Sequence, residues 1–390
     1  MEGTIDQGHL KRGAERVSTA RPLCFGVAGP ADDASLRRLL RENPMGGRIS
    51  VSLECEPSFL DAMSIEGGFH QTIVARETDA ARIVAMGSRS VREAFVNGLP
   101  TRIGYLGHLR IDPSHRHRVR LLRGGFASAR PRVSGQDSTI DLTCIMADNR
   151  PAIRLLTAGL SGLPCYLEQE RIFTLAMPTS RTVRTRRNQR VHVESGSATR
   201  LDEIVACLDR NNRRFQFAPR WTSDDLTSPE RCRGLQLGDF HVALSNGRMV
   251  GCLARWNQRA FKQVVIRGYS PALRRARPLF NSIAPLLGKP RLPRVGESIN
   301  SVFLSHLAVD GDDPTIAMLL LKTAHRCART AGHDLVILSL AGRHPLFNVI
   351  RRGVSHRSWE SILYVVRWHD RPDAPFDLDG RVAHVEAAIL

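Results

Sequence analysis

The feature that most constrains the fold of this chain is a repeated octapeptide. Residues 105–112 read Tyr-Leu-Gly-His-Leu-Arg-Ile-Asp, and residues 303–310 read Phe-Leu-Ser-His-Leu-Ala-Val-Asp. Both stretches fit one pattern: an aromatic residue, Leu, a small residue, His, Leu, any residue, a β-branched residue and Asp. Self-similarity of this kind predicts one structural unit that occurs twice.

The segments that follow the two octapeptides agree in their order. Each octapeptide is followed by a helical stretch and then by a strand that begins Asp-Leu, at Asp141 and at Asp334. A second helix and a last strand come next, at 150–159 and 170–177 in the first copy and at 345–353 and 361–368 in the second. Strands and helices in this order predict an α/β (α+β layered) fold with a mixed central sheet flanked by helices in each copy.

The boundary between the copies is predicted from composition. A chain of 390 residues suits two domains. Residues 178–196 are polar and basic and lack an apolar helical stripe, which is typical of a linker. We therefore place the first domain at 20–177, the linker at 178–189 and the second domain at 190–369. The basic residues of the linker leave open a second interpretation, in which they form an anion-binding patch.

The positive charge of the chain does not by itself identify a partner. The formal net charge is +18, and almost all of the positive charge is arginine. Such a charge attracts anions, including CoA phosphates, nucleic acid and acidic lipid. The arginines are spread along the chain and aromatic residues make up only 6% of it, so no platform for stacking bases is visible. Nucleic acid is therefore kept only as an alternative partner.

Other compositional features predict an intracellular setting. No apolar run approaches the roughly 20 residues that span a bilayer, and residues 1–20 lack the apolar stretch of a signal peptide. The eight cysteines are scattered and form no C-x-x-C pair, so the spacing indicates no structural zinc site. We expect a cytoplasmic protein with free thiols, no metal and no membrane partner.

Three stretches of the first copy carry motifs. Residues 108–113 end a strand at a proline, residues 114–121 form a basic loop that opens a helix, and residues 146–156 join a strand to a helix. In this order they resemble the fourth strand, the pyrophosphate loop and the Asn-x-x-Ala-x-x-Phe-Tyr segment of the GNAT (Gcn5-related N-acetyltransferase) superfamily. The resemblance covers most of 20–177 and, more weakly, 190–368.

The resemblance implies an acyl-CoA-dependent N-acyltransferase, most simply one that transfers an acetyl group from acetyl-CoA to an amine of a small molecule or peptide. A helix N-terminus offers unpaired N–H groups to a pyrophosphate, and arginines there add charge-assisted hydrogen bonds. The residues that this would assign to the cofactor are Leu109, Arg110, Ile111, Arg116, His117, Arg118, Val119, Arg120, Leu121 and Asn149.

The loop and the following segment depart from the family pattern. Counted from Arg116, the loop glycines of the family fall at Val119 and Leu121, where a Cβ crowds the approach of the backbone to phosphate. The tyrosine that usually acts as general acid falls at Leu156, and Tyr166 is the candidate to replace it. Asn149 has a second interpretation, as the N-cap of a helix.

His108 is the candidate general base, because family members often place the base on or near this strand and histidine titrates near neutral pH. His306 occupies the same position in the second copy, which favours the alternative that both histidines are structural. The pair His115 and His117 lacks a third ligand at a recognisable spacing, so it predicts no metal site.

The second copy is predicted to be degenerate. Asp310, Asp312 and Asp313 stand where the phosphates would dock, and their charge would repel them. Two rival functions remain open: a non-catalytic GNAT-like protein that binds a ligand, a protein or nucleic acid, and a transferase that uses aminoacyl-tRNA as donor.

Overall fold

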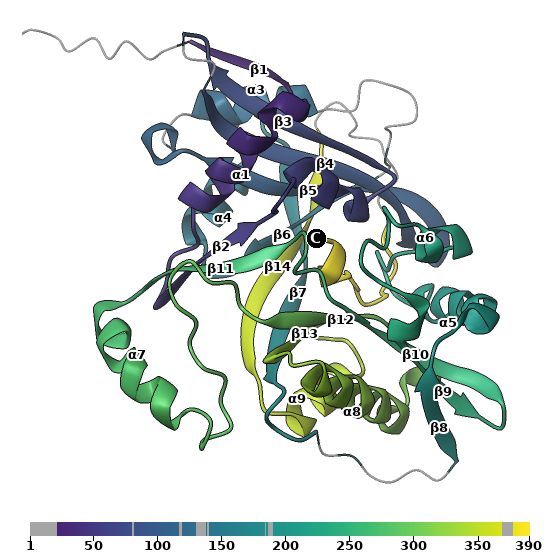
Figure 1. Cartoon of the computed structure of the whole chain (residues 1–390). Helices are drawn as coiled ribbons and strands as arrows, with labels where there is room; N and C mark the ends of the chain where they lie inside the picture. Colours follow the sequence, from purple (N-terminus) through teal and green to yellow (C-terminus); the bar gives the residue numbers. More distant parts are fainter. Residues whose placement is uncertain are drawn as a thin grey trace, which may run out of the picture.

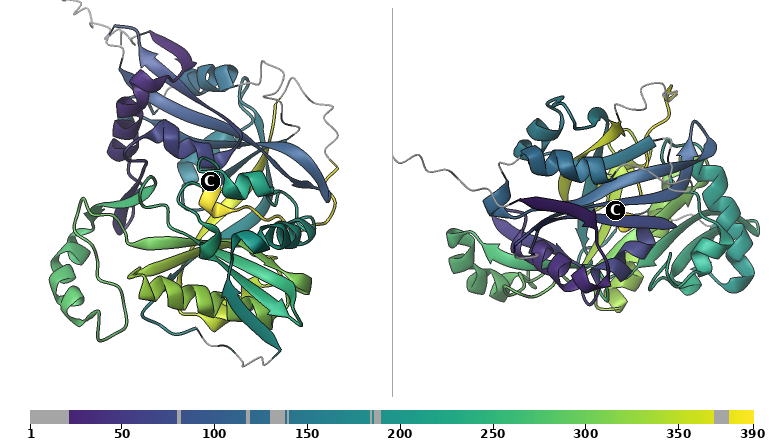
Figure 2. Two further views of the ribbon diagram at one scale, coloured as in Figure 1. Left: turned by 45° about the vertical axis from the view of Figure 1, so that its right-hand side comes forward. Right: turned by 90° about the horizontal axis from the view of Figure 1, so that it is seen from above.

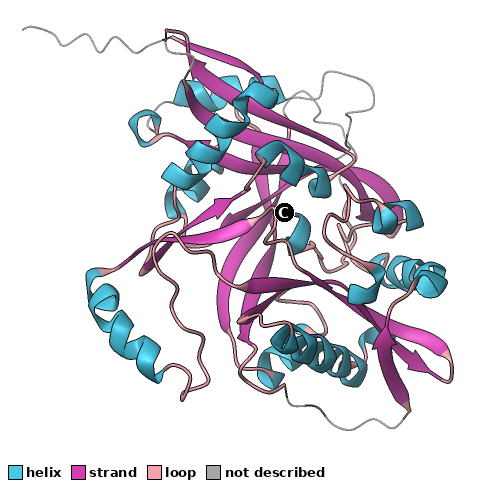
Figure 3. Cartoon of the chain, viewed as in Figure 1, coloured by secondary structure: helices cyan, strands magenta, loops and turns pink. Residues whose placement is uncertain are grey.

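A computed structural model describes residues 22–79, 82–116, 119–129, 138, 140–183, 185, 190–368 and 377–390 of the chain. The first half contains β1 Leu23–Val27, α1 Asp33–Glu42, β2 Ile49–Glu54, α2 Phe59–Ala62, β3 Phe69–Glu77, β4 Ile83–Val96, β5 Leu99–Ile111, α3 Val119–Ala129, β6 Ile140–Met146, α4 Arg150–Leu156 and β7 Cys165–Pro178. The second half contains β8 Val191–Ser195, α5 Leu201–Asn212, α6 Ser223–Thr227, β9 Phe240–Ser245, β10 Arg248–Trp256, β11 Gln263–Tyr269, α7 Pro271–Ile283, β12 Ser301–Val309, α8 Pro314–Thr330, β13 Leu335–Ala341, α9 Phe347–Gly353 and β14 Arg357–Arg367. The predicted α/β class, a mixed sheet flanked by helices, is confirmed (Figure 3).

One continuous sheet runs through both halves. Its twelve strands follow the order β1-β3-β4-β5-β6-β14-β7-β13-β12-β10-β9-β8. Each half contributes five neighbouring strands at its own end, but the last strands are exchanged: β14 pairs with β6, and β7 pairs with β13. The exchanged strands β7 and β14 pair with each other in the middle, antiparallel (Figure 1). The domain boundaries predicted from the sequence, 20–177 and 190–369, stay a proposal. Each predicted domain ends with a strand, β7 or β14, that pairs with a strand of the other half.

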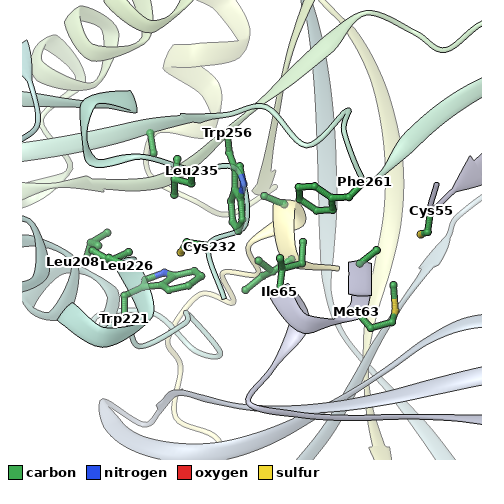
Figure 4. Packing of buried hydrophobic residues seen from close by; sticks show 14 of the residues in the cluster. Cys55, Met63, Ile65, Leu208, Trp221, Leu226, Cys232, Leu235, Trp256 and Phe261 are labelled. Atoms are coloured by element: carbon green, nitrogen blue, oxygen red, sulfur yellow. The ribbon is translucent and has the colours of Figure 1, made fainter. Parts of the chain in front are cut away.

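The two halves also share a hydrophobic core. Met63 and Ile65, next to α2, belong to the same buried cluster as Trp221, Trp256 and Phe261 from the second half. Figure 4 shows these side chains converging from elements of both halves. Burial of this apolar surface stabilises the arrangement of the halves as well as each half.

The repeated histidine marks a β-bulge in each half. Gly87 of β4 lies opposite both His108 and Leu109, because Met86 pairs with Arg110 and Ser88 with Gly107. The equivalent bulge in β12 places His306 and Leu307 opposite Leu253. The φ angles of His108 and His306 are 52° and 56°, in the left-handed region that few non-glycine residues adopt. The octapeptide therefore encodes a bulge.

Beyond the bulge the two parallel strands of each half diverge. β5 pairs with β6 only at Ile103–Tyr105, and β12 pairs with β13 only at Ser301–Phe303. In the second half, α8 packs on β12 and β13 as well as on β8, β9 and β10. In the first half, α3 packs mainly on β1, β3 and β4. The strand beyond the bulge is therefore buried in β12 but partly open in β5, where Leu109 is 38% exposed.

A buried ion pair attaches the exchanged strand β14 to the first half. Asp141 at the start of β6 accepts a hydrogen bond from the Trp368 indole, 2.6 Å from Nε1 to Oδ2, and Trp368 directly follows β14. The guanidinium of Arg89 in β4 lies 3.1 Å from the same carboxylate, and both side chains are almost fully buried. A Cβ at Gly104 would lie 1.6 Å from Asp141 Oδ1, so glycine there makes room for this contact.

Loss of the buried charge at Asp141 should destabilise the whole sheet. We expect Asp141→Asn to lower the free energy of unfolding by about 3–5 kcal/mol, because the buried guanidinium of Arg89 loses the charge of Asp141. Urea denaturation measures the difference. Asp334→Asn is the control, since Asp334 begins the other Asp-Leu stretch of the sequence and is exposed; equal losses in the two variants would contradict the role assigned to Asp141.

The strand exchange predicts the behaviour of a cut chain. A protease site introduced within 178–189 should give two fragments that elute together in gel filtration under native conditions, because β14 and β7 hold each fragment in the sheet of the other. The fragments should separate only in denaturant. Two fragments that part and stay folded in native buffer would show that each half completes its own sheet.

Candidate functional site

The open bulge of β5 carries the first group of the site, His108. Its Nε2 lies 2.8 Å from Oε1 of Glu66, which ends the short 3-10 turn Met63–Glu66. The ring of Phe59 meets the imidazole edge-on, with centroids 5.4 Å apart. His108 is held between a carboxylate and an aromatic ring, and its left-handed backbone fixes where the imidazole leaves the strand.

Glu66 is the centre of a buried charged cluster. Its carboxyl is 1% exposed and has Lys262 Nζ at 3.8 Å as a second cationic neighbour. Arg92 donates from Nη1 to the backbone carbonyls of Glu66 and Ile389, at 3.3 and 3.1 Å. Burial opposes ionisation, but His108, Lys262 and Arg92 outweigh it and lower the pKa of Glu66. The carboxyl is therefore an anion at neutral pH.

Burial also changes the pKa of Arg92. Desolvation, together with the nearby charge of Arg231, lowers the pKa of Arg92 to about 10. Its Nε and Nη2 donors are buried and make no hydrogen bond within the described residues. A cation of this kind adds positive potential between the halves, close to Glu66.

The equivalent histidine of the second half has different surroundings. Trp221, Phe240 and Trp256 surround the ring of His306, with centroids at 4.3, 5.2 and 5.8 Å. Burial lowers its pKa to about 3, so this imidazole stays neutral. Its backbone N, rather than its ring, contacts a glutamate: it donates to Glu386 Oε2 at 2.7 Å. The alternative interpretation of the repeated histidine therefore describes His306 well, while His108 alone is paired with a charge.

The loop after β5 leads to a helix start without acidic residues. Asp112 accepts hydrogen bonds from the backbone N and the hydroxyl of Ser114, at 3.0 and 2.6 Å, and pairs with Arg82 at 2.6 Å. Arg116 is exposed and donates to Asn43 Oδ1 at 3.0 Å. α3 then begins at Val119, and its first turn carries no Asp or Glu. Two predicted cofactor residues, His117 and Arg118, lie outside the described residues.

In the loop after β12, carboxylates of the loop cap the following helix and form ion pairs. Asp313 accepts from the backbone N–H groups of Thr315 and Ile316, at 2.7 and 3.3 Å, and so occupies the donors at the start of α8. Asp310 pairs with Arg210 at 2.7 Å, and Asp312 pairs with Arg214. The acidic residues of this loop are thus neutralised within the protein, and the helix start has little left to offer an anion.

The two positions where the family pattern has glycine, Val119 and Leu121, differ in their surroundings. Leu121, at one of the two glycine positions of the family pattern, packs into the core with Ala75, Val84 and Ala85. Its Cβ therefore faces the sheet. Val119 is half-buried, whereas Arg120 is exposed beside the helix start. The start of this eleven-residue helix therefore carries an exposed arginine and no acidic residue in its first turn.

The three predicted cofactor residues of the strand, 109–111, lie at the end of β5, just before this loop. Leu109 is exposed, Arg110 is half-buried, and Ile111 packs against the cluster that holds Leu121. Desolvation lowers the pKa of Arg110. These three residues follow the bulge, where β5 has separated from β6, so they border the gap between the diverging strands.

Two predicted residues lie away from His108. Tyr166 packs with Leu106 and Tyr364 in a cluster that also holds α3 and α4 side chains, on the face opposite α1 and α2. Burial raises the pKa of this phenol, and the charge of Asp141 adds to the effect. Asn149 is exposed and caps α4, accepting from the backbone N of Ala152 at 3.4 Å. The structure thus does not bring Tyr166 and Asn149 to the histidine.

The partners of His108 could not be found from the sequence. Glu66 and Lys262 stand far from the histidine along the chain, one in a short turn of the first half and one in a loop of the second. The signal available was weak: Glu66 is a single acid directly after the apolar Ile65, followed by two glycines. Only the packing of the halves against each other shows that Lys262 completes the cluster.

The arrangement of the chain is similar to that of solved structures. A GCN5-related N-acetyltransferase from Sphaerobacter thermophilus matches 88% of this chain and 95% of its own, at 13% identity and a TM-score of 0.55. N-myristoyltransferase from Saccharomyces cerevisiae, solved with bound myristoyl-CoA, matches 94% of this chain and 85% of its own, at 11% identity and a TM-score of 0.56. A glucosamine N-acetyltransferase region of a fungal multi-domain β-N-acetylglucosaminidase matches 89% of this chain at a TM-score of 0.58, with 13% identity, and spans 38% of that protein. No protein-family model and no curated protein matches the sequence.

These likenesses show that nearly the whole chain has a GNAT-like fold. Within the described residues no helix is long and apolar enough to cross a membrane. The same residues contain no group of three or more His, Cys, Asp or Glu side chains that could hold a metal ion. All eight cysteines are free thiols.

The two buried glutamates predict opposite dependences of stability on pH. Burial raises the pKa of Glu386 from 4.5 to about 7. The folded protein therefore binds a proton at Glu386 that the unfolded chain has released, so this residue contributes a fall in the free energy of unfolding as pH rises from 4.5 to 7. The lowered pKa values of the buried His306, His344 and His384 contribute a rise over part of the same range. Glu386→Gln should remove the fall and make the free energy of unfolding rise more steeply with pH than in the wild type, as measured by urea denaturation at a series of pH values.

Glu66→Gln provides the control with the opposite sign. The pKa of Glu66 is lowered, so its stabilising contribution is present above the ordinary value of 4.5 and is lost as pH falls below it. This variant should flatten the acid side of the profile and leave the change between pH 4.5 and 7 in place. Parallel profiles for the wild type and both variants would contradict the two assignments.

Proposed function

We propose that this protein is an acyl-CoA-dependent N-acyltransferase whose only donor site lies in the first half, between the bulge of β5 and the start of α3. Acetyl is the simplest acyl group, and the acceptor is an amine of a small molecule or peptide. The observation that carries the proposal is the difference between the two bulged strands. β5 is open beyond its bulge and leads to a helix whose first turn carries no acidic residue, whereas β12 is buried and leads to a helix capped by Asp313.

The donor is assigned to backbone and side chains that the first half leaves available. Leu109, Arg110 and Ile111 offer strand backbone beside the gap between β5 and β6. Arg116 and Arg120 offer charge next to the N–H groups of α3. When bound there, an acyl-CoA supplies an activated thioester. The similar fold of an enzyme solved with myristoyl-CoA supports a donor of this class.

His108 and Glu66 are proposed to hold the proton that an ammonium acceptor must lose before it can attack. Nε2 of His108 is 2.8 Å from the Glu66 carboxylate, so a proton that arrives at the imidazole is stabilised by an adjacent anion. Phe59 restricts the imidazole to one orientation. Tyr166, on the other face of the sheet, is given no part in this step.

A non-catalytic GNAT-like binding protein is the second candidate. It is favoured by the departures of the loop from the family pattern and by Arg116, which already donates to Asn43. The two candidates differ in a measurable way, because only the enzyme releases free CoA in proportion to an amine acceptor. A coupled thiol assay with acetyl-CoA and a panel of amines tests this difference directly.

Binding of the donor should be confined to one half. We expect calorimetry with CoA to give one equivalent per chain, and hydrogen exchange to show protection over roughly residues 107–125. Arg116→Ala with Arg120→Ala should weaken binding about tenfold or more, because two charge-assisted contacts to phosphate are lost. The matched control is Arg326→Ala with Arg329→Ala, which removes two exposed arginines from α8 and should leave affinity unchanged.

Three outcomes would overturn this assignment. The first is two equivalents of CoA, the second is protection centred on residues 305–322, and the third is equal weakening by both double variants. Saturable CoA binding without thiol release for any amine would leave the donor site standing and favour the non-catalytic candidate. In an active protein, Glu66→Gln should lower kcat and shift its pH profile, while CoA affinity stays the same.

A further inference from the structure

A helical arm projects from the second half between β11 and β12. It comprises residues 270–300, with α7 at its centre, and Figures 1 and 2 show α7 standing apart from the sheet. None of the residues of α7 is fully buried. A helix of thirteen residues gains little stability by itself, so an unburied helix is usually one that packs on something else.

The exposed side of the arm is an apolar stripe. Ala272, Ala276, Leu279, Ile283 and Leu286 recur at helical spacing and are all exposed. Leu279 is 70% exposed and Leu286 is 87% exposed. Large aliphatic side chains gathered on one side of a helix are a typical sign of an interaction surface.

The polar side of the arm is turned inward and fixed there. Asn281 exchanges two hydrogen bonds with the backbone of Leu292, at 2.9 and 2.8 Å, and Arg277 donates to the same carbonyl at 3.1 Å. The tip is tied to the end of β7, where Ser180 donates to the carbonyl of Gly288 at 2.7 Å. These contacts fix the arm with Leu273, Phe280 and Ala284 on its less exposed side, and the apolar stripe is held toward solvent.

The charge around the stripe points to one kind of partner. Arg274, Arg275, Lys289, Arg291 and Arg294 are exposed along the arm, and Glu297 is its one acidic residue. Cations that flank an exposed aliphatic stripe match the surface of an anionic bilayer, where the stripe enters the acyl region and the cations meet the headgroups. A second copy of this chain fits less well, because the chain carries a net charge of +18 and two arms would repel each other.

We propose that the arm of residues 270–300 docks the protein on anionic lipid bilayers, with Leu279, Ile283 and Leu286 inserted into the interface. The docking is peripheral and needs no spanning helix. It is independent of the donor site, which lies in the other half. If an acyl group or acceptor amine is supplied at the bilayer, the arm would keep the protein close to it.

Vesicle flotation with the full chain tests the proposal. The protein should float with phosphatidylcholine vesicles that contain about one third phosphatidylglycerol and not with pure phosphatidylcholine. The triple variant Leu279→Ser, Ile283→Ser, Leu286→Ser should bind the anionic vesicles at least about tenfold more weakly. Leu99→Ser with Val27→Ser, two exposed apolar positions outside the arm, is the matched control and should bind as the wild type does.

A second measurement reports insertion directly. The Leu286→Trp variant should show quenching of the introduced indole by lipids brominated on the acyl chain, and none by the same lipids when Arg274→Glu and Arg275→Glu are added. Circular dichroism and thermal unfolding confirm that each variant is folded.

Several results would overturn the proposal. One is vesicle binding that the triple variant retains, which would assign binding to the net charge of the chain alone. Others are no binding to anionic vesicles at low salt, or no quenching by acyl-chain bromine. A dimer in sedimentation that the triple variant abolishes, without vesicle binding by the wild type, would assign the stripe to a second copy.

Discussion

The pairing of β7 with β14 is the interaction on which the rest of the structure depends. Each half ends with a strand that completes the sheet of the other, so the central pair of the sheet is formed by the last strands of the two halves. The consequence is one sheet with one shared core. Asp141 attaches β14 to the first half, because its buried carboxylate contacts both Arg89 of the first half and Trp368, which directly follows β14. A charged group placed so deeply is stable only with both partners in position.

The exchange also brings the two bulges to the same central region. Glu66 faces one and Glu386 faces the other, and Lys262 of the second half approaches Glu66 of the first. Identical backbone geometry therefore supports two different environments. Around His306 three aromatic rings exclude water and keep the imidazole neutral. His108 instead contacts the carboxylate of Glu66, which has Lys262 and Arg92 as cationic neighbours. The repeated octapeptide forms a bulge twice, and the packing of side chains makes the surroundings of the two bulges different.

The asymmetry extends to the helices that follow. In the second half Asp313 satisfies the N–H groups of α8, and that helix covers both diverging strands. In the first half no carboxylate caps α3 within the described residues, and the helix lies to one side. The capped and covered helix of the second half has its first N–H groups satisfied by Asp313, whereas the first turn of α3 carries an exposed arginine and no acidic residue. This difference between the halves is the reason why we propose the donor site in the first half only.

The sequence by itself determined the class of the fold and the two related stretches around its octapeptides, because strand and helix periodicity and a repeated octapeptide are local patterns. That each octapeptide forms a bulge was found only in the structure. The sequence also indicated the asymmetry of the loops, since Asp312 and Asp313 stand next to each other in the chain. Only the tertiary structure decided that the last strands are exchanged, that Leu121 faces the core, that His108 pairs with Glu66 while Tyr166 lies on the opposite face, and that the apolar side of α7 faces solvent. The physical reason is that strand pairing, burial and charge depend on contacts between residues far apart in the chain. A sequence pattern shows which residues share a face, and the packing of the whole chain decides what that face meets.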